Sequence, residues 1–462
     1  MIFVSFGLKL KYKNILVNGK ETNMKEKLLL GVRKVDITPE PGCRLFGYVD
    51  DLYSETVNDP LDATAFAFSQ GEASAIMVSL TVVSLSQELS DRIRRGISEK
   101  TGVPVSNIML SCTHTHSGPA TIAMDSGWGD VDREYCEGIL IPATVKAAFE
   151  AWAIKEPVTM GYATGESHIG INRRELTLDN KIILGQNPWG PYNPKMSVLS
   201  FKNESGACVA NMIHYGMHGT CSGHNKEITQ DWAGVMVRRM ESLTGGVTAF
   251  FNGPEGDVGP RLTNGRTTGI CDIGYAKETG GKAAFDAMEI YNKIKVYKAP
   301  TLTARNGYLK LPLLPRLSKE AAEAKRAHLI EVQKTAAERH LIHTLGKVID
   351  SYSDGYEDKE YNEIEQNVIS LDNIVFAGFP YELFSEIGMR IQRSAGELEV
   401  LPVAMANGVI GYFPTEDAVC RGGYEINMFK ATNLQEYVSD VDFHLVTETL
   451  RNIGVDLDSL KK

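Results

Sequence analysis

The sequence predicts an α/β fold in which mixed parallel and antiparallel sheets are flanked by helices, with an inserted helical arm. The 462 residues are 43% hydrophobic and 23% charged, an ordinary globular composition. Short apolar runs typical of strands alternate along the chain with longer runs typical of helices. Residues 318–347 carry only helical signals. We therefore predict one domain over residues 24–462, with residues 318–347 as a helical insertion.

The first predicted elements form a β–α–β unit. Residues 28–42 have the composition of a strand that ends in a proline-rich turn. Residues 64–86 indicate two strands joined around Gly71. Residues 89–104 indicate a helix that ends at Gly102 and Pro104. Residues 107–114 indicate the next strand.

The same alternation continues through the rest of the chain. Buried strands are predicted at residues 196–201, 208–215, 248–252 and 373–379, and helices near residues 134–151, 232–243 and 275–293. Residues 318–347 are rich in Ala, Glu, Lys and Arg, which predicts a helical arm inserted into the domain. Its three histidines, His328, His340 and His343, are expected on a solvated helix face.

Charge and hydropathy exclude two classes of partner. A net charge of −10 and a pI near 5.6 argue against a general nucleic-acid binder, which needs clustered basic residues. Apolar runs are too short for a membrane-spanning helix.

Lysines interrupt the apolar N-terminal segment before a signal peptide could form, so residues 1–23 are expected to be a disordered extension. Whether the chain starts at Met1 or Met24 is left open.

The cysteines indicate a reducing compartment. There are seven, an odd number, scattered along the chain and never in CxxC spacing. Reduced thiols fit this pattern better than a disulfide framework, so a cytoplasmic location is expected. The oligomeric state is left open, with a homo-oligomer as one alternative.

Residues 111–119, "SCTHTHSGP", place two histidines at the end of a predicted strand. If the extended conformation persists, His114 and His116 point to the same face, at the sheet edge where α/β folds place ligands. Such pairs also arise by chance and bond to backbone groups, so alone this pair leaves both alternatives open.

A second histidine cluster lies in "NMIHYGMHG", where His214 and His218 are four residues apart. The two glycines nearby argue against a helix, and a strand running into a loop would expose His218 at its end. Two histidines and a carboxylate form a common catalytic zinc set that keeps one position open for water.

Three further segments carry candidate residues that are weak individually. The turn-rich loop "FFNGPEGDVGPR" is longer than a simple connection requires; its candidate residues are Asn252, Gly253, Asp257 and Gly259. Glu382 in "PYEL" stands at a helix start, where a glutamate usually only compensates the helix dipole. Tyr412 and Tyr424 would ordinarily indicate aromatic packing.

Taken together and in order, these motifs resemble the catalytic domain of the neutral, non-lysosomal ceramidases and their bacterial superfamily. The resemblance runs from "GVRKVDITP" through "THTHSGP", "INRR", "HGTCSG", "NGPEGDVGPR", "PYE" and "NGVIGYFPT" to "GGYE", most of the chain. It implies zinc ligation by His114, His218, Glu382 and Tyr412. It also implies that His116 acts as an acid/base or substrate contact, and that Arg173 and Tyr424 reach polar groups of the substrate.

Two departures from the resemblance bear on the substrate. Gly259 stands where ceramidases carry a serine in the "GDVSP" loop, and the chain ends without their immunoglobulin-like C-terminal domain. We therefore expect a substrate other than ceramide itself.

The predicted function is a Zn²⁺-dependent hydrolase that cleaves an N-acyl amide bond of a small polar molecule by metal-activated water. Backbone N–H groups of residues 252–260 could hold the developing oxyanion, or the loop could only shape the pocket. The alternatives are an ester, lactone or glycoside-related hydrolase, and a metal-binding sensor that has lost turnover. A structural zinc site is disfavoured because no cysteine-rich ligand set is present.

Overall fold

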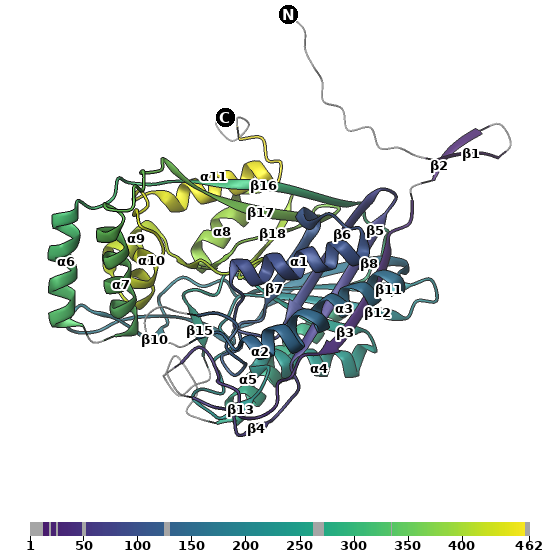
Figure 1. Cartoon of the computed structure of the whole chain (residues 1–462). Coiled ribbons are helices and arrows are strands. Elements are labelled where there is room, and N and C mark those ends of the chain that lie inside the picture. The colour runs from purple at the N-terminus through teal and green to yellow at the C-terminus, as the bar shows by residue number, and fades with distance from the viewer. Residues whose placement is uncertain are drawn as a thin grey trace, which may run out of the picture.

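The computed structural model describes residues 13–17, 20–24, 26–48, 52–123, 130–261, 272–333 and 335–457. It has the predicted α/β fold with mixed sheets (Figure 1). Of the predicted extension, the structure describes only a hairpin of β1 (Lys13–Val17) and β2 (Lys20–Met24). The domain boundary at residue 24 stays a prediction.

The largest sheet has eight strands in the order β14-β12-β11-β8-β3-β5-β6-β7. Their bounds are β3 Leu29–Asp36, β5 Asp62–Gln70, β6 Ala73–Leu80, β7 Ile108–Cys112, β8 Glu156–Glu166, β11 Lys195–Asn203, β12 Cys208–Tyr215 and β14 Val247–Asn252. Only the outermost pairs, β6–β7 and β12–β14, are parallel. The predicted β–α–β unit is thus present at one edge, and a second one lies at the other.

The connections of these parallel pairs are helices. Helix α1 (Gln87–Thr101) joins β6 to β7 and begins at the Ser86 cap, while α4 (Asp231–Thr244) joins β12 to β14. The edge strands β7 and β14 contact each other, and Asn252 Nδ2 donates a hydrogen bond to the Thr113 carbonyl at 3.4 Å. The loops that follow the two edges are thereby brought to one place.

A second sheet of four strands, β16-β17-β18-β20, packs face to face on the first. Its strands are β16 Leu302–Pro312, β17 Tyr361–Leu371, β18 Ile374–Gly378 and β20 Glu399–Val403. Side chains alternate along the first sheet accordingly: in β5, Phe66 and Phe68 face the second sheet, while Ala65 and Ala67 face helices. The core therefore lies in three apolar layers, between the sheets and under the helices on either side.

Helices cover the outer face of each sheet. Helices α1 and α3 (Ile141–Ala153) cover one half of the large sheet, and α4 and α5 (Ile273–Asn292) cover the other. Helices α8 (Ser385–Ser394) and α11 (Val441–Asn452) cover the second sheet. No helix within the described parts of the chain combines the length and the hydropathy needed to cross a membrane.

The remaining elements are short and lie around the ends of the sheets. They are β4 Thr56–Val57, β9 Gly170–Leu176, β10 Ile182–Asn187, β13 Glu227–Ile228, β15 Val258–Pro260, β19 Tyr381–Leu383, β21 Gly411–Phe413, η1 Val105–Asn107, α2 Arg133–Tyr135, η2 Cys136–Leu140, α9 Glu416–Arg421 and α10 Tyr424–Lys430. Strand β15 pairs with β9, and β19 pairs in parallel with β21.

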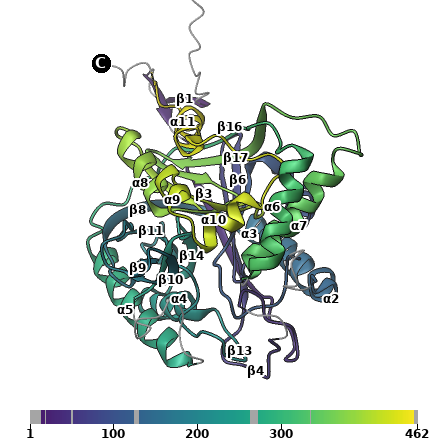
Figure 2. The same ribbon diagram turned by 90° about the vertical axis from the view of Figure 1, so that its left-hand side faces the viewer.

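The predicted helical arm consists of two helices, α6 (Lys319–Val332) and α7 (Ala336–Asp350). The capping box of Thr335 and Glu338 starts the second helix. Thr344 Oγ1 donates to the carbonyl of Ala431, which follows α10, at 2.8 Å, and Leu345 packs nearby, so the arm is fixed beside α10 (Figure 2).

Candidate metal centre

His114 lies directly beyond β7, where the chain leaves the extended conformation. Its φ of +65° is rare for a side chain other than glycine and indicates a locally strained backbone. The ring Nδ1 is 2.8 Å from the carbonyl oxygen of Val83. Because a carbonyl can only accept, Nδ1 carries the proton and Nε2 presents its lone pair.

His218 lies on the loop after β12 and is oriented in the same manner. Its Nδ1 donates to the Glu255 carbonyl at 2.9 Å, and its buried Nε2 has no hydrogen-bond partner in the described part of the chain. That Nε2 lies 3.2 Å from Glu382 Oε2, and His114 Nε2 lies 3.5 Å from the same oxygen. Two imidazole lone pairs and one carboxylate oxygen therefore converge.

Close backbone packing holds the ligand-bearing loops together. Gly219 N donates to the His114 carbonyl at 3.2 Å, and His116 N donates to the Gly219 carbonyl at 3.0 Å. A Cβ atom at Gly219 would stand 2.6 Å from the His114 oxygen, and one at Gly256 would stand 2.4 Å from the Glu382 oxygen. Glycine is required at both positions because the backbones approach too closely for a side chain.

Glu382 and Tyr412 are neighbours in register across the parallel pair β19–β21. Arg173 fixes the tyrosine by donating from a terminal nitrogen to the Tyr412 hydroxyl at 3.0 Å, while its Nε donates to Glu425 Oε1 at 3.0 Å. Arg173 is buried and does not line the cavity described below. It therefore lies behind Tyr412, although the sequence analysis expected it to reach the substrate.

The charges and lone pairs of the cluster favour a cation between its donor atoms. Burial lowers the pKa of His218 to about 3, so its imidazole is neutral at pH 7. Lone pairs facing a carboxylate at 3.2 and 3.5 Å repel one another unless a positive ion lies between them. The residues present thus fit a divalent metal bound by nitrogen and oxygen ligands.

Tyr412, the fourth ligand implied by the resemblance, is buried beside this cluster. Burial and the Glu382 carboxylate raise the pKa of its phenol well above 10, whereas the Arg173 guanidinium lowers it. A bound metal would add a second positive charge next to the hydroxyl and favour the phenolate. The arrangement is compatible with ligation by Tyr412, which stays a prediction.

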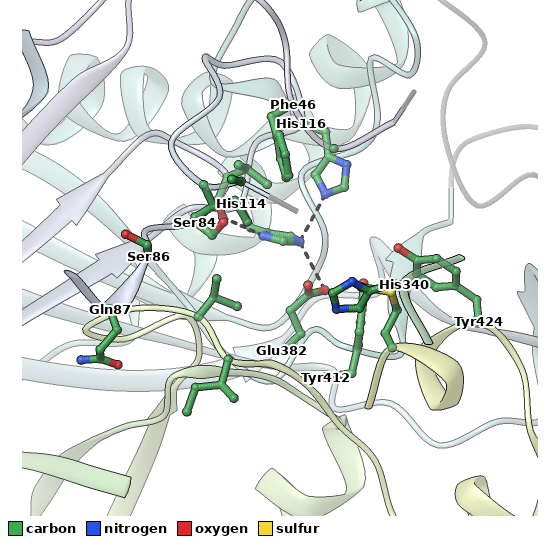
Figure 3. Close-up of a pocket in the computed structure, with 18 residues that line it drawn as sticks. Phe46, Ser84, Ser86, Gln87, His114, His116, His340, Glu382, Tyr412 and Tyr424 are labelled. Atoms are coloured by element: carbon green, nitrogen blue, oxygen red, sulfur yellow. Dashed lines mark hydrogen bonds and ion pairs between the residues drawn. The ribbon is translucent and has the colours of Figure 1, made fainter. Parts of the chain in front are cut away.

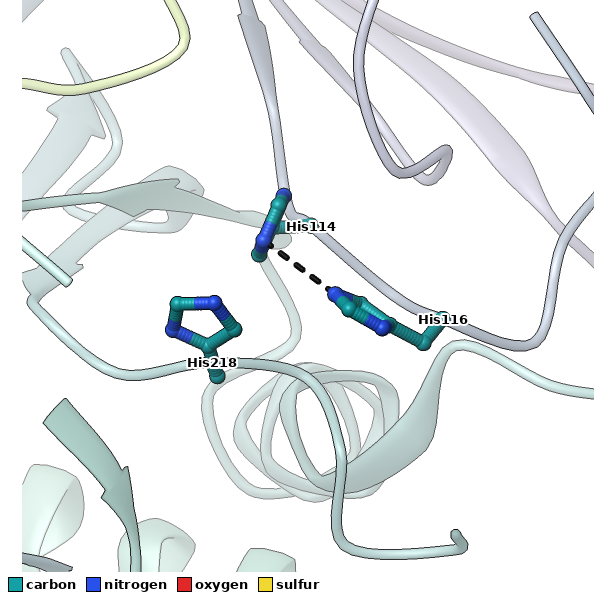
Figure 4. A group of neighbouring side chains, drawn as sticks. All are labelled: His114, His116 and His218. Atoms are coloured by element: carbon teal, nitrogen blue, oxygen red, sulfur yellow. Dashed lines mark hydrogen bonds between the residues drawn. The ribbon is translucent and has the colours of Figure 1, made fainter. Parts of the chain in front are cut away.

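His116 lies on the open side of the cluster. Its Nε2 is 3.2 Å from His114 Nε2, and the rings of His114, His116 and His218 face one another (Figure 4). These three histidines also form a group that could hold a metal ion. Burial lowers the pKa of His116 well below 6.5, so its ring is neutral at pH 7.

A cavity of about 280 Å³ opens in front of the cluster (Figure 3). One wall carries polar groups from His114, His116, Glu382, Tyr412 and Tyr424. Apolar side chains also line the cavity, namely Phe46, Val83, Ile122, Val409, Ile410 and Met428. The cavity thus joins the candidate metal ligands to a surface suited to a short hydrocarbon group.

The helical arm contributes His340 to this cavity. The sequence analysis expected all three arm histidines on a solvated face, and this is wrong for His340, which is half-buried; His328 and His343 are exposed. The reason is that α7 packs against the segment after α10 and turns one face inward.

The glycine-rich loop after β14 lies behind the cluster and does not line the cavity. The Asn252 side chain and the Gly253 N–H form hydrogen bonds with the backbone of Met217, Thr113 and Tyr215. Asp257 accepts a hydrogen bond from Ser385 N at 2.8 Å. Gly259 pairs with Ile171 between strands β15 and β9. The N–H groups of residues 253, 256 and 258 are bonded to carbonyls, so they support the ligand loops and do not point at a substrate.

Two residues near the cluster were missed by sequence analysis. Glu255 is fully buried inside that loop. His340 follows the cluster histidines His114, His116 and His218 by more than a hundred positions in the sequence. The acidic residue within "NGPEGDVGP" was a usable signal for Glu255. No local sequence signal distinguishes His340 from its helical neighbours.

Comparison with known proteins matches residues 28–288 to the family described as neutral/alkaline non-lysosomal ceramidase, N-terminal. The chain is 24% identical to neutral ceramidase B of Dictyostelium discoideum over 365 residues, covering 67% of this chain and 49% of that protein. It is 25% identical to the neutral ceramidase of Pseudomonas aeruginosa over 290 residues, covering 56% and 42%. The chain therefore spans less than half the length of these two relatives.

The crystal structure of the neutral ceramidase from Pseudomonas aeruginosa has the same fold. The superposition has a TM-score of 0.72 at 19% sequence identity and covers 93% of this chain and 74% of that chain. A structure described as ceramidase complexed with C2 superposes with a TM-score of 0.70 at 18% identity.

Proposed function

The chain belongs to the neutral/alkaline non-lysosomal ceramidase family, and we propose that it is a zinc-dependent hydrolase that cleaves an N-acyl amide bond of a small substrate. The observation that carries this proposal is the convergence of His114 Nε2, His218 Nε2 and Glu382 Oε2 beside a cavity that His114 and Glu382 line. The relatives named above support the amide bond, because they are ceramidases.

Residues in and beside the cavity would divide the work of the proposed reaction. When bound, zinc would supply an activated water and polarise the scissile carbonyl. His116, neutral at pH 7, can accept a proton and transfer it to the leaving amine nitrogen. Arg173 holds the Tyr412 hydroxyl in place, and Tyr424 presents its phenol to the substrate.

The size of the cavity argues for a short acyl group. Its volume of about 280 Å³ lies at the lower end of the range for drug-sized ligand pockets. The apolar side chains that line the cavity would receive the acyl chain. A preference against ceramide, expected from Gly259, is part of the proposal.

A panel of N-acyl amides with one amine and acetyl, hexanoyl or palmitoyl chains would test the proposal. We expect hydrolysis to be fastest for the short chains, to stop after chelation, and to return on adding Zn²⁺. Ester and lactone analogues in the same panel would identify the alternative chemistry. Turnover that is unaffected by metal removal, or no hydrolysis of any acyl compound by the zinc-loaded protein, would contradict the proposed function.

A further inference from the structure

Glu255 is a buried carboxyl group that lacks the partners such a group needs. It lies between β14 and β15 with none of its surface exposed, and neither Oε1 nor Oε2 has a hydrogen-bond partner among the residues that the structure describes. Buried carboxylates are ordinarily hydrogen-bonded, paired with a cation or bound to a metal. This one has no hydrogen-bond partner at either oxygen in the described part of the chain, which leaves both oxygens available to a metal ion.

The side chain of Glu255 lies beside the candidate metal ligands. Ligand atoms of Glu255, His114 and Glu382 all lie within 4.8 Å of one another. The Nδ1 atoms of His114 and His218 donate to the Val83 and Glu255 carbonyl oxygens, so neither N–H is available to the Glu255 carboxyl. Arg173 directs its Nε and one terminal nitrogen to Glu425 and Tyr412.

The Glu255 carboxyl reaches the metal-ligand cluster from a different side than a substrate in the cavity would. His114, His116 and Glu382 line the cavity, whereas Glu255 does not. Its backbone oxygen accepts from His218, which places the residue behind that ring. The Glu255 carboxyl thus reaches the cluster from the protein interior and leaves the cavity side open.

We propose that Glu255 is a further carboxylate ligand of the metal, bound from the interior side opposite the substrate cavity. This rests on the proposed function in requiring a divalent metal at the site. With Glu255, the donors are two imidazoles, two carboxylates and the phenol of Tyr412, one more than tetrahedral zinc requires. Two carboxylates also neutralise the charge of a divalent ion. An oxygen-rich set of this kind also suits Mn²⁺ or Fe²⁺.

The substitution Glu255→Gln in the full chain tests this, because it removes the charge and keeps the shape. We expect Zn²⁺ affinity, measured by competition with a chromophoric chelator, to fall at least about tenfold. The absorption spectrum of the Co²⁺-loaded protein should change as one oxygen ligand is lost. Asp442→Asn is the matched control: that carboxylate is also buried, but it lies in α11 and accepts from Arg390, so its loss should change neither the affinity nor the spectrum.

A crystal structure of the metal-loaded wild-type protein gives an answer even if the variant does not fold. The proposal predicts a Glu255 oxygen about 2.0–2.3 Å from the ion. A distance beyond about 3 Å, or a Glu255→Gln variant with unchanged affinity and spectrum, would overturn it while leaving the proposed function standing. A wild-type protein that binds no metal would instead overturn the proposed function together with this inference.

Discussion

His214 and His218 are only four residues apart, and both are buried, yet they differ in what their rings contact. His214 Nε2 lies 2.7 Å from the Pro402 carbonyl oxygen, which fixes the end of β12 to the second sheet. His218 uses Nδ1 for a carbonyl and leaves Nε2 facing Glu382. Burial lowers the pKa of His214 to about 4 and that of His218 to about 3.

The comparison shows that neither burial nor a lowered pKa distinguishes a ligand histidine from a structural one. The distinction is whether a ring nitrogen still presents a lone pair to other ligand atoms after the backbone contacts are made. His218 Nε2 meets this condition, and His214 Nε2, bonded to a carbonyl, does not.

The largest expected effect is that of His218→Ala. Removing one of three convergent ligands should abolish stoichiometric metal binding and lower turnover by more than about 100-fold, since even groups that only orient a ligand are worth about 10–100-fold. Metal content of the purified protein and hydrolysis of the best N-acyl substrate check this. His214→Gln, the matched control, should retain the metal; loss of metal in both variants would erase the distinction between the two histidines.

The next largest effect is expected for Arg173→Met, which removes the donor that fixes Tyr412. We expect kcat/KM to fall about 10–100-fold, because a ligand that loses its orienting partner is held less well. Steady-state kinetics at saturating metal would measure it. Arg173→Lys should recover little activity, since one ammonium cannot replace the planar fork that reaches both Tyr412 and Glu425. Wild-type kinetics in either variant would contradict a role for Arg173 in positioning Tyr412.

A smaller effect is expected for His340→Ala on the helical arm. The side chain lines the cavity but belongs to no group of candidate ligands, so KM should rise several-fold while metal content stays unchanged. Exposed His343 on the same helix provides the matched control, and His343→Ala should leave both quantities as they are. Metal loss in the His340 variant would mean that the arm helps to hold the ion.

The last effect concerns stability and pH and should leave turnover at neutral pH unchanged. The pKa of His214 is about 4 in the folded state and near 6.5 when unfolded, so the unfolded state binds more protons between these values. The free energy of unfolding should therefore fall as pH drops from 6.5 toward 4, with His214 contributing roughly 1.4 kcal/mol per pH unit. Denaturant melts across this range should show a shallower slope for His214→Gln; identical slopes would contradict the assignment.

The candidate ligands were predictable because their motifs follow one another in a specific order. The structure brings together His114, His218, Glu382 and Tyr412, residues that the sequence spreads over about three hundred positions. The two-residue spacing of His114 and His116 alone would predict an extended strand, which is wrong because His114 adopts a φ of +65°. Sequence order indicated which residues meet, but the backbone geometry decides how they meet.

Other parts of the site and fold could not be predicted because they depend on tertiary packing. The position of the 252–260 loop behind the cluster follows from backbone pairing with β9 and β19, which no local pattern reveals. Strand β16 was missed because Arg305, Asn306 and Gly307 interrupt its apolar pattern; only Leu309 and Leu311 give the alternation of a one-sided strand. The cytoplasmic location expected from the cysteines stays a prediction, although the six in the described residues are free thiols.

The central claim is that one metal ion, held by His114, His218 and Glu382, is required for turnover. Stepwise addition of Zn²⁺ to the chelated protein, with N-acyl hydrolysis measured at each step, tests it most directly. The account predicts no activity in the metal-free protein and a linear recovery that ends at one equivalent per chain. Full activity in protein shown to be metal-free would contradict it.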